Sequence, residues 1–244
     1  MHTVATNQWL QKKGVSRNLV TSYEKGGWVK RIGFGAVVRC GDKVEWLGAV
    51  YAMQEYLGLT IHPGSKTALA LHGSAHFIPM GEERIVLFAR RNDHLPEWFR
   101  KYQWNVRIEV IKTELFKSGT EAGMEKIDRG EFSIIVASRE RAILEFLYRL
   151  HADSDGGEAL QLMENLATLR PAVVQKLLET CSSIKAKRLF MVLARLADHQ
   201  WLQKLALSRV NFGRGKRLFA RGGFLDREYR ITVPNTWKPE KGVL

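Results

Sequence analysis

The sequence predicts an α+β protein, and two observations on its hydrophobic residues support this fold class. Apolar residues recur every three or four positions in several segments, which is typical of amphipathic helices, whereas short apolar runs between turn residues indicate strands. With 45% apolar and 10% aromatic residues, the 244 residues can form packed cores. We predict a small N-terminal domain over 1–60, a mixed α/β segment over 61–116, and a mainly helical domain over 117–244 that ends in a basic, strand-rich segment.

Residues 15–39 predict a short helix followed by a basic β-hairpin. Ser16 can accept a backbone N–H at the helix start, and Gly26 with Gly27 can end the helix. Between these limits, the helical spacing places three residues on one apolar stripe: Leu19, Val20 and Tyr23.

The hairpin is predicted from two strand-like runs, 28–32 and 36–39, joined by a tight turn at Gly33-Phe34-Gly35. Upstream, residues 4–12 can form a helix, and Gly14 provides the turn that follows it. The expected core contacts of this first helix are Trp9 and Leu10. This order of elements is that of a winged helix-turn-helix, whose second helix normally lies in the major groove of DNA.

The polar residues of this segment are of the types that contact DNA. Arg and Asn side chains form paired hydrogen bonds with guanine and adenine edges, while Ser and Thr contact bases or phosphates. We expect the second helix to select bases through Arg17, Asn18, Thr21 and Ser22, with Lys25 on the same surface. We expect phosphate contacts from five surrounding cations: Lys12, Lys13, Lys30, Arg31 and Arg39. The alternative is an ordinary amphipathic helix with a solvated polar face.

The cationic residues are concentrated at the two ends of the chain. The formal net charge is +13, and residues 1–39 hold seven Lys or Arg against one acidic residue. Residues 181–244 hold fourteen against four, whereas residues 113–180 hold eight against twelve. Two basic poles around a neutral to acidic middle are the distribution expected of a protein that binds a polyanion.

The rest of the chain predicts strands and helices in the middle and mostly helices afterwards. Strands are expected over 85–89 and 106–111, and helices over 46–57, 64–73 and 96–102, the last with Pro96 at its first position. The polar, glycine-rich interval 117–131 is expected to be a loop. Further helices are expected after a cap at Ser138, around Pro171 and over 184–197, with short strands and turns from Arg209 onward.

The basic C-terminal segment has a pattern of its own. Five cations, Arg209, Arg214, Lys216, Arg217 and Arg221, lie among Phe212, Phe219 and Phe224. Arginine interleaved with aromatic residues suits contact with phosphates and bases. Three interpretations remain open: a nucleic-acid surface, a β-hairpin with a solvated charged face, and a surface for an acidic protein partner or for that partner's nucleic-acid substrate.

The spacing of potential metal ligands predicts no metal site and no cofactor. His62, His72 and His76 have no third ligand at a usual spacing, so we expect them to pack or to cap. Cys40 and Cys181 lie far apart and outside any CxxC pattern, so we expect buried free thiols in a reducing cytoplasm. The sequence has no signal-peptide pattern and no run near the roughly 18 apolar residues of a membrane span, so a cytoplasmic protein without membrane contact is expected.

The alternative to a binding protein is a nuclease with a restriction-endonuclease-like middle region. Its site would need Glu109 and Lys112 on one face of a strand around a metal, with Asp93 upstream. Side chains three positions apart in a strand lie on opposite faces, so this spacing is wrong by one residue. We therefore expect no catalytic residues and no enzymatic activity.

Several motifs resemble the AbiEi family of antitoxins. In the predicted winged helix they are Trp9-Leu10, Gly14-Val15-Ser16, Tyr23, Gly27-Trp28, Arg31-Ile32-Gly33 and Gly35-Ala36. They continue with Trp46, Gly48-Ala49, Tyr51-Ala52, Gln54, His62, Gly64, Thr67-Ala68-Leu69, Leu71, Gly73 and His76. Ser138-Arg-Glu-Arg-Ala142 resembles the start of that family's C-terminal helical region. The resemblance is close over 9–80 and looser, but collinear, to the end of the chain.

This resemblance implies a bacterial antitoxin of a type IV toxin–antitoxin system. Members of the family bind inverted repeats in the double-stranded DNA of their own promoter through the winged helix, and so repress their operon. Their C-terminal domain is associated with counteracting a nucleotidyltransferase-like toxin. The resemblance leaves open whether antitoxin and toxin touch, and a winged helix that binds protein instead of DNA is a further alternative.

Overall fold

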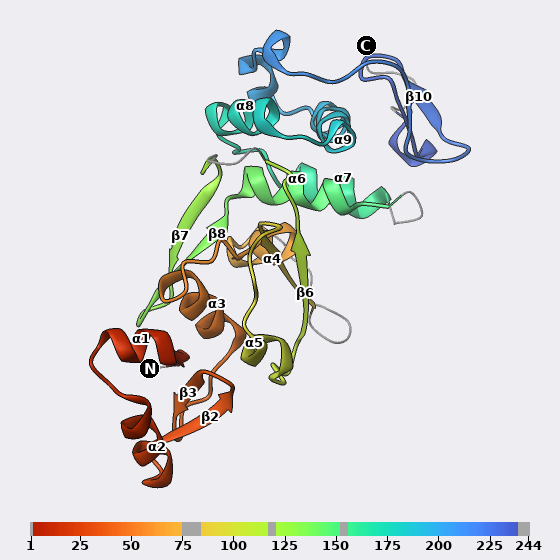
Figure 1. Ribbon diagram of the computed structural model, residues 1–244. Helices are drawn as coiled ribbons and strands as arrows, with labels where there is room; N and C mark the ends of the chain where they lie inside the picture. Colours follow the sequence, from red (N-terminus) through yellow and green to blue (C-terminus); the bar gives the residue numbers. More distant parts are fainter. Residues whose placement is uncertain (1, 75–83, 117–120, 152–155, 239–244) are drawn as a thin grey trace. The chain divides into compact units, whose positions relative to one another are not determined.

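The computed structural model describes residues 2–74, 84–116, 121–151 and 156–238 (Figure 1). These residues form a mixed α+β fold with several small sheets and divide into two compact units. The described residues of the first unit fall within Met1–Pro63, Pro79–Thr113 and Lys126–Val136. Those of the second fall within Gly64–Ile78, Glu114–Glu125 and Ala137–Leu244. Each unit therefore combines segments that are distant in sequence.

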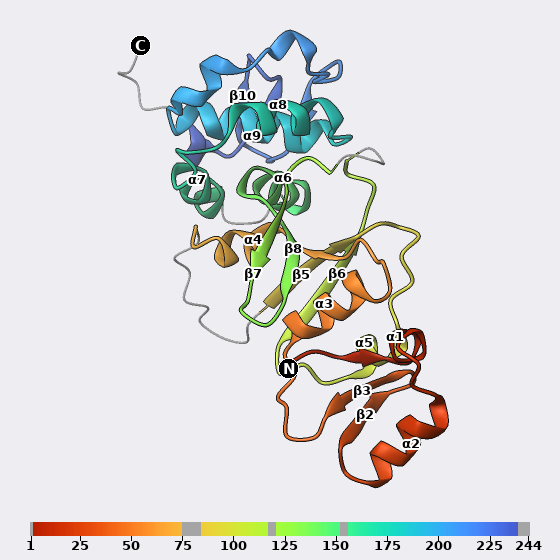
Figure 2. The ribbon, with the colours of Figure 1, turned by 90° about the vertical axis from the view of Figure 1, so that its left-hand side faces the viewer.

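The N-terminal sheet of the first unit has the strand order β1-β3-β2. Its strands are β1 (Ala5–Thr6), β2 (Val29–Gly33) and β3 (Ala36–Arg39), and α1 (Asn7–Lys12) and α2 (Arg17–Lys25) lie between β1 and β2 in sequence. The predicted second helix and the hairpin β2–β3 are thus confirmed. Figure 1 and Figure 2 both show α2 lying beside this hairpin, and β2 is the main packing partner of α2.

The first helix is shorter than predicted. Residues 5 and 6 pair with β3 through Ala5↔Val37 and Thr6↔Ala36, so the helix begins at Asn7 instead of residue 4. The Thr6 hydroxyl caps it by accepting a hydrogen bond from the backbone N–H of Trp9 at 3.3 Å. Trp9 and Leu10 are half-buried, and the Trp9 ring stacks on Tyr56 with ring centroids 4.7 Å apart.

The predicted apolar stripe of the second helix is only partly buried. Val20 is 4% exposed, whereas Leu19 and Tyr23 are 39% and 41% exposed. The physical reason is that α2 packs mainly on a single strand, β2, which covers one narrow face of the helix. Most of the surface of α2 is therefore open to solvent.

A second sheet of the first unit has the order β4-β5-β6, formed by β4 (His62–Pro63), β5 (Arg84–Ala89) and β6 (Arg107–Lys112). The two predicted strands β5 and β6 are parallel and are connected through α5 (Glu97–Lys101). We expected Pro96 to be the first residue of this helix. It instead precedes the helix as its cap residue. The third helix, α3 (Trp46–Glu55), is buried along most of its length.

The interval predicted as a loop, 117–131, contains a strand in its described part. β7 (Met124–Asp128) pairs with β8 (Ser133–Ala137) to form a two-stranded ribbon. Local composition misled the prediction, because strand formation depends on the partner strand, and β8 is rich in buried β-branched residues. The Gln54 side chain bonds the backbone of Ile135 in β8 through both amide atoms, at 2.8 and 2.9 Å.

The second unit is mainly helical. Its helices are α4 (Ser65–Leu71), α6 (Arg139–Arg149), α7 (Gly156–Glu164), α8 (Pro171–Thr180) and α9 (Ile184–Leu196), which agree with the predicted segments. Its core forms where α6 packs on α4, α8 and α9. Ser138 precedes α6 as expected, but its hydroxyl makes no cap hydrogen bond and instead donates to Glu140 at 2.6 Å.

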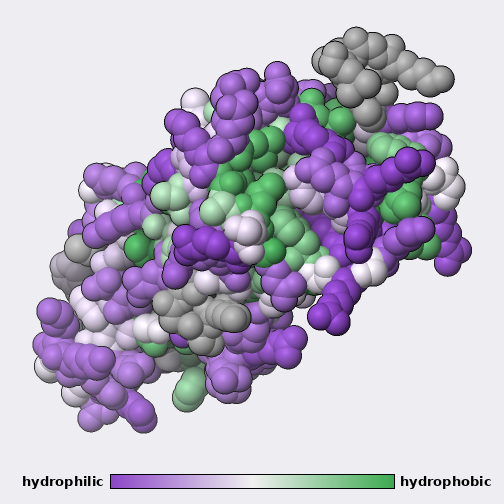
Figure 3. Space-filling model, turned by 90° about the horizontal axis from the view of Figure 1, so that it is seen from above, coloured by the Kyte–Doolittle hydropathy of each residue, from purple (hydrophilic) through white to green (hydrophobic). Residues whose placement is uncertain are grey.

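The described chain ends in short elements around a small sheet. The short 3₁₀ helices are η1 (Gln200–Lys204), η2 (Leu207–Arg209) and η3 (Asn235–Trp237). The strands are β9 (Arg217–Leu218), β10 (Phe224–Asp226) and β11 (Ile231–Val233). β11 lies between β10 and β9, antiparallel to the first and parallel to the second. Hydrophilic residues cover most of the surface seen from above, with hydrophobic patches between them (Figure 3).

The two cysteines differ in exposure. Of the two predicted buried thiols, Cys181 is buried and burial raises its pKa to about 11, whereas Cys40 is exposed. Cys40 is exposed because it follows the last residue of β3, where the chain leaves the sheet. Among the described residues, every helix is too short or too polar to cross a bilayer.

Candidate nucleic-acid interface

The polar face of α2 is accessible along its whole length. Ser16 caps the helix by accepting a hydrogen bond from the backbone N–H of Leu19 at 3.2 Å. All five polar residues expected to face DNA on this helix are exposed: Arg17, Asn18, Thr21, Ser22 and Lys25. The Thr21 hydroxyl donates to the carbonyl oxygen of Arg17 at 3.1 Å, so its oxygen remains available as an acceptor.

The cations expected to contact phosphates are exposed as well, and they lie on three elements. Lys12 is in the last turn of α1 with Lys13 after it, Lys30 and Arg31 are on β2, and Arg39 ends β3. Arg31 differs from the others because its guanidinium binds the carboxylate of Glu24 on α2 at 2.9 Å. The hydrogen bond with Glu24 raises the pKa of Arg31, and the pair ties the hairpin to the helix.

A groove of about 580 Å³ runs beside these residues within the first unit. It is lined by α1, by the N-terminal half of α2, by the hairpin turn and by the start of α5, and its residues include Gln11, Arg17, Thr21, Arg31 and Phe34. Two of the four residues expected to select bases, Arg17 and Thr21, thus line a groove shared with the hairpin. Asn18 and Ser22 are exposed but do not line it.

The turn of the hairpin is held from two sides. Gly33 lies so close to α5 that a Cβ atom at this position would be 2.7 Å from the Cβ of Trp98. The carbonyl oxygen of Gly35 accepts a hydrogen bond from the backbone N–H of Asn7 at 2.8 Å. Phe34 between them is 84% exposed. The sequence did not predict the exposure of Phe34 or the support from Trp98, although Gly33 was a possible signal of close packing.

The C-terminal basic residues are exposed, whereas the phenylalanines between them are not. Arg209 is bound to Glu179 at 2.9 Å, while Arg214, Lys216, Arg217 and Arg221 are exposed. The three phenylalanines are buried or half-buried. Phe212 packs on Tyr229 and Phe219 stacks on Trp237, with ring centroids 5.6 and 6.1 Å apart. The phenylalanines thus pack with other rings and with buried aliphatic residues such as Ile231 and Val233.

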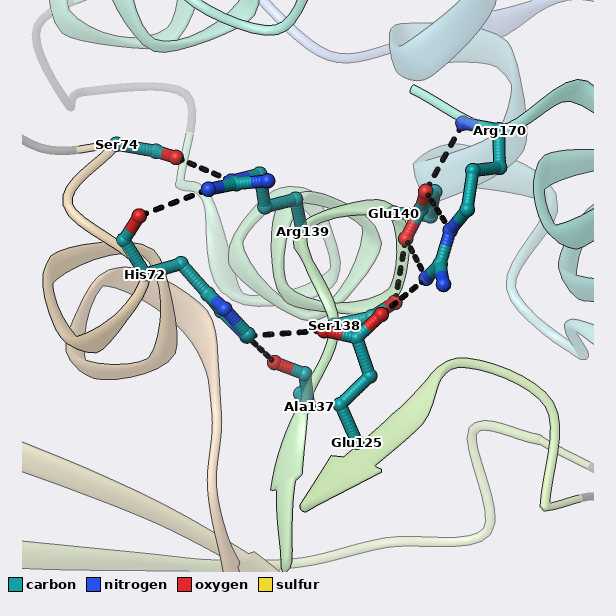
Figure 4. Close-up of polar contacts among 8 residues, drawn as sticks. All are labelled: His72, Ser74, Glu125, Ala137, Ser138, Arg139, Glu140 and Arg170. Atoms are coloured by element: carbon teal, nitrogen blue, oxygen red, sulfur yellow. Dashed lines mark hydrogen bonds and ion pairs between the residues drawn. The ribbon is translucent and has the colours of Figure 1, made fainter. Parts of the chain in front are cut away.

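The second unit contains a network of buried and half-buried polar groups that the sequence did not predict (Figure 4). Glu140 is 3% exposed and accepts hydrogen bonds from the backbone and guanidinium of Arg170, each at 2.9 Å, and from Ser138. Burial alone would raise the pKa of Glu140, but the hydrogen bonds from Arg170 and Ser138 outweigh it and lower the pKa to about 2. This network therefore fixes the start of α8.

The residues at the edge of this network form hydrogen bonds and ion pairs with other residues of the second unit. Arg170 also forms an ion pair with Glu125 at 2.5 Å. His72 contacts the carbonyl oxygen of Ala137 at 2.9 Å through its Nε2, and Arg139 donates to the carbonyl oxygen of His72 at 2.9 Å (Figure 4). These contacts join α4 to the start of α6, which is a packing role, as expected for His72.

Two residues of the nuclease alternative, Asp93 and Lys112, form polar contacts in the first unit. The Asp93 carboxylate accepts hydrogen bonds from the backbone N–H and hydroxyl of Thr60, at 3.0 and 2.6 Å. Lys112 donates to the backbone oxygen of Asp93 at 2.6 Å and not to its carboxylate. His62 contacts the Thr60 carbonyl oxygen at 3.0 Å, and His76 lies outside the described residues. Across the described chain, no three His, Cys, Asp or Glu residues are grouped so that they could hold a metal.

Comparison with known proteins adds two family matches and a structural similarity. Residues 1–80 match the AbiEi antitoxin N-terminal domain of transcriptional regulators, and residues 82–234 match the family described as transcriptional regulator, AbiEi antitoxin, type IV toxin–antitoxin system. No curated protein matches the chain. The crystal structure of the RV2827C protein from Mycobacterium tuberculosis superposes with a TM-score of 0.61 at 13% identity, over 95% of this chain and 86% of that one.

The structural similarity concerns the fold alone, since the identity is low. The family matches together cover nearly all of the chain and agree with the motifs of its N-terminal segment. The chain therefore belongs to the AbiEi antitoxin family, the transcriptional regulators of type IV toxin–antitoxin systems.

Proposed function

We propose that this chain is a DNA-binding autorepressor and antitoxin that binds inverted repeats in the promoter of its own operon, in the bacterial cytoplasm. In this proposal α1, α2 and the hairpin β2–β3 act as a winged helix-turn-helix. The observation that carries it is the exposed polar face of α2, which lies beside a basic hairpin, with β2 as the main packing partner of the helix. Major-groove binding requires such an unobstructed helix face.

The two groups of residues have different roles in this proposal. Arg17, Asn18, Thr21 and Ser22 would discriminate bases, because their side chains can form directional hydrogen bonds with base edges. Lys12, Lys13, Lys30 and Arg39, with Lys25, would hold the duplex through phosphates, which gives affinity without sequence preference. Arg31 would contribute less than these, because it is already bound to Glu24.

The functional partner in this proposal is a nucleotidyltransferase-like toxin, whose effect the second unit would counteract without catalysis of its own. The carboxylate of Asp93 is engaged by Thr60, which does not favour the nuclease alternative. Incubation with plasmid and Mg²⁺ tests that alternative directly, since DNA cleavage that Glu109→Ala abolishes would support a nuclease.

The base-reading assignment is tested by the double variant Arg17→Ala/Asn18→Ala in a gel-shift titration with promoter and unrelated duplexes. We expect it to lose the preference for the promoter while keeping the wild-type circular dichroism spectrum. The matched control is Arg100→Ala/Gln103→Ala, which also removes one exposed arginine and one exposed amide from the first unit. If the double variant discriminates as well as the wild type, α2 does not read bases. DNA binding that is absent or insensitive to salt would instead favour a winged helix that binds protein.

A further inference from the structure

The last strands of the second unit carry many more cations than acidic residues. Residues 210–238 contain seven Lys or Arg and two acidic residues. Six of the cations form what we term the C-terminal basic surface, and all six are exposed: Arg214, Lys216, Arg217, Arg221, Arg227 and Arg230. The two acidic residues, Asp226 and Glu228, both form ion pairs with Arg195 of α9. The six cations therefore have no carboxylate partner within the described part of the chain.

A buried arginine of α9 organises the backbone that carries this surface. Arg188 is 1% exposed. Its guanidinium donates hydrogen bonds to four backbone carbonyl oxygens, those of Phe212, Gly213, Gly215 and Arg230. Burial, together with the nearby charges of Arg217 and Arg230, lowers the pKa of Arg188. The loop and the start of β11 are thus held around a positive charge that no described carboxylate neutralises.

The backbone at Arg230 has a conformation that is uncommon for a residue other than glycine. Arg230 has a φ of +51°, a left-handed conformation that glycine adopts with less strain. Its carbonyl oxygen accepts hydrogen bonds from Arg188 at 2.8 Å and from the backbone N–H of Arg217 at 2.9 Å. These bonds explain the conformation, but glycine could make them as well.

The surroundings of these cations indicate which form of nucleic acid they suit. Proteins that bind single strands combine cations with accessible aromatic rings on which bases stack. Here Phe212 packs on Tyr229 and Phe219 on Trp237, and the exposed large apolar residue of these strands is Leu218. Phe212 and Phe224 are half-buried and Phe219 is buried, so no phenylalanine of this segment is fully exposed as a stacking platform. A surface of exposed cations without fully exposed rings suits the phosphates of a duplex, whose bases are already stacked.

We infer that the C-terminal basic surface binds the phosphate backbone of double-stranded DNA without reading its sequence. The surface would give the chain a second DNA contact besides α2 and the hairpin. The inference rests on the proposed function only in taking DNA as the nucleic acid. Each phosphate contact contributes about 0.9 units to the slope of log K against log salt concentration, so the contribution of this surface is measurable.

The test uses the full chain with Arg17→Ala/Asn18→Ala as background, so that base reading by α2 is removed. Binding to a non-operator duplex longer than two helical turns is measured by fluorescence anisotropy over a series of salt concentrations. We expect the added changes Lys216→Ala/Arg217→Ala to make the fall of log K with log salt concentration less steep by about two units of slope. Arg214→Ala alone should make it less steep by about one unit. The matched control Lys176→Ala/Lys204→Ala removes two exposed cations elsewhere in the second unit and should leave the slope unchanged.

The outcomes separate this inference from the proposed function. If the Lys216→Ala/Arg217→Ala variant and the Lys176→Ala/Lys204→Ala control show the same dependence of log K on salt concentration, the C-terminal basic surface does not contact DNA. This conclusion holds whatever the promoter preference of the wild type. Tighter binding of the corresponding single strand, or of duplex RNA, that depends on the same residues would overturn the assignment to double-stranded DNA. Loss of promoter preference in Arg17→Ala/Asn18→Ala concerns α2 alone. Thermal unfolding of each variant controls for changes in stability.

Discussion

At the residue scale, the structure distinguishes two neighbouring cations that are equivalent in the sequence. Lys30 and Arg31 are adjacent on β2, and both are exposed. Arg31 is bound to Glu24, the single acidic residue of residues 1–39, whereas Lys30 has no carboxylate partner among the described residues. Lys30 is therefore the cation of β2 that is free to bind a phosphate.

This difference predicts salt effects of opposite sign. Lys30→Ala should make the fall of log K with log salt concentration less steep, by about one unit of slope, for all DNA sequences. Glu24→Gln should make this fall steeper, by up to about one unit of slope, because Arg31 is released to contact a phosphate. Glu55→Gln, which removes an exposed carboxylate of α3, serves as the control. An unchanged slope in Lys30→Ala would mean that the hairpin does not lie on the phosphate backbone.

Glu140 predicts a pH dependence of stability. Its pKa is about 2 in the folded protein against an ordinary value of 4.5, so it contributes stability above about pH 5 that is lost as the pH falls toward 2. Glu140→Gln should lower the free energy of unfolding by about 1–3 kcal/mol at pH 7, because Arg170 loses one of its two carboxylate partners. Urea unfolding at several pH values should show this difference shrinking in acid. Glu164→Gln, an exposed carboxylate of α7, should show no such difference at any pH.

At the scale of elements, the hairpin depends on its contact with α5. Gly33→Ala places a methyl group within 2.7 Å of the Cβ of Trp98, and because the contact involves the stem and backbone of Trp98, a change of rotamer cannot relieve it. We expect a loss of about 1–3 kcal/mol in the free energy of unfolding. Phe34→Ala, at the exposed neighbouring position, should change it by less than about 0.5 kcal/mol. Equal effects of the two variants would mean that the hairpin turn yields freely.

Helices were easier to predict than their buried faces or than the paired strands. Ser16 and Gly26 limit α2 as the sequence indicates, because capping is a local interaction. The burial of Val20 without Leu19 and Tyr23 depends on how much of α2 the strand β2 covers, and spacing cannot give this. β7 was missed for the same reason, since a polar strand is decided by its partner β8.

At the scale of the whole molecule, the uneven charge predicts steep salt dependence. Both ends of the chain are basic, with a net formal charge of +13 overall. If six or more cations contact phosphates, raising the salt concentration from about 50 to 200 mM should weaken DNA binding by about 10³-fold or more. Isothermal titration calorimetry or fluorescence anisotropy of the wild type with promoter DNA would measure this effect. Affinity that changes less than about tenfold over this range would contradict a role for both basic regions in binding DNA.

The sequence by itself determined the helix–hairpin order of residues 15–39, the two basic ends of the chain and the family resemblance, because these follow from spacing, composition and motifs. That Glu109 and Lys112 form no catalytic site, which strand geometry alone argues, stays a prediction. Only the tertiary structure decided which cations are free. The pairing of Arg31 with Glu24, of Arg195 with Asp226, and the burial of Arg188 all join residues of different elements. Whether a charge is neutralised depends on neighbours in space, and these are fixed by packing.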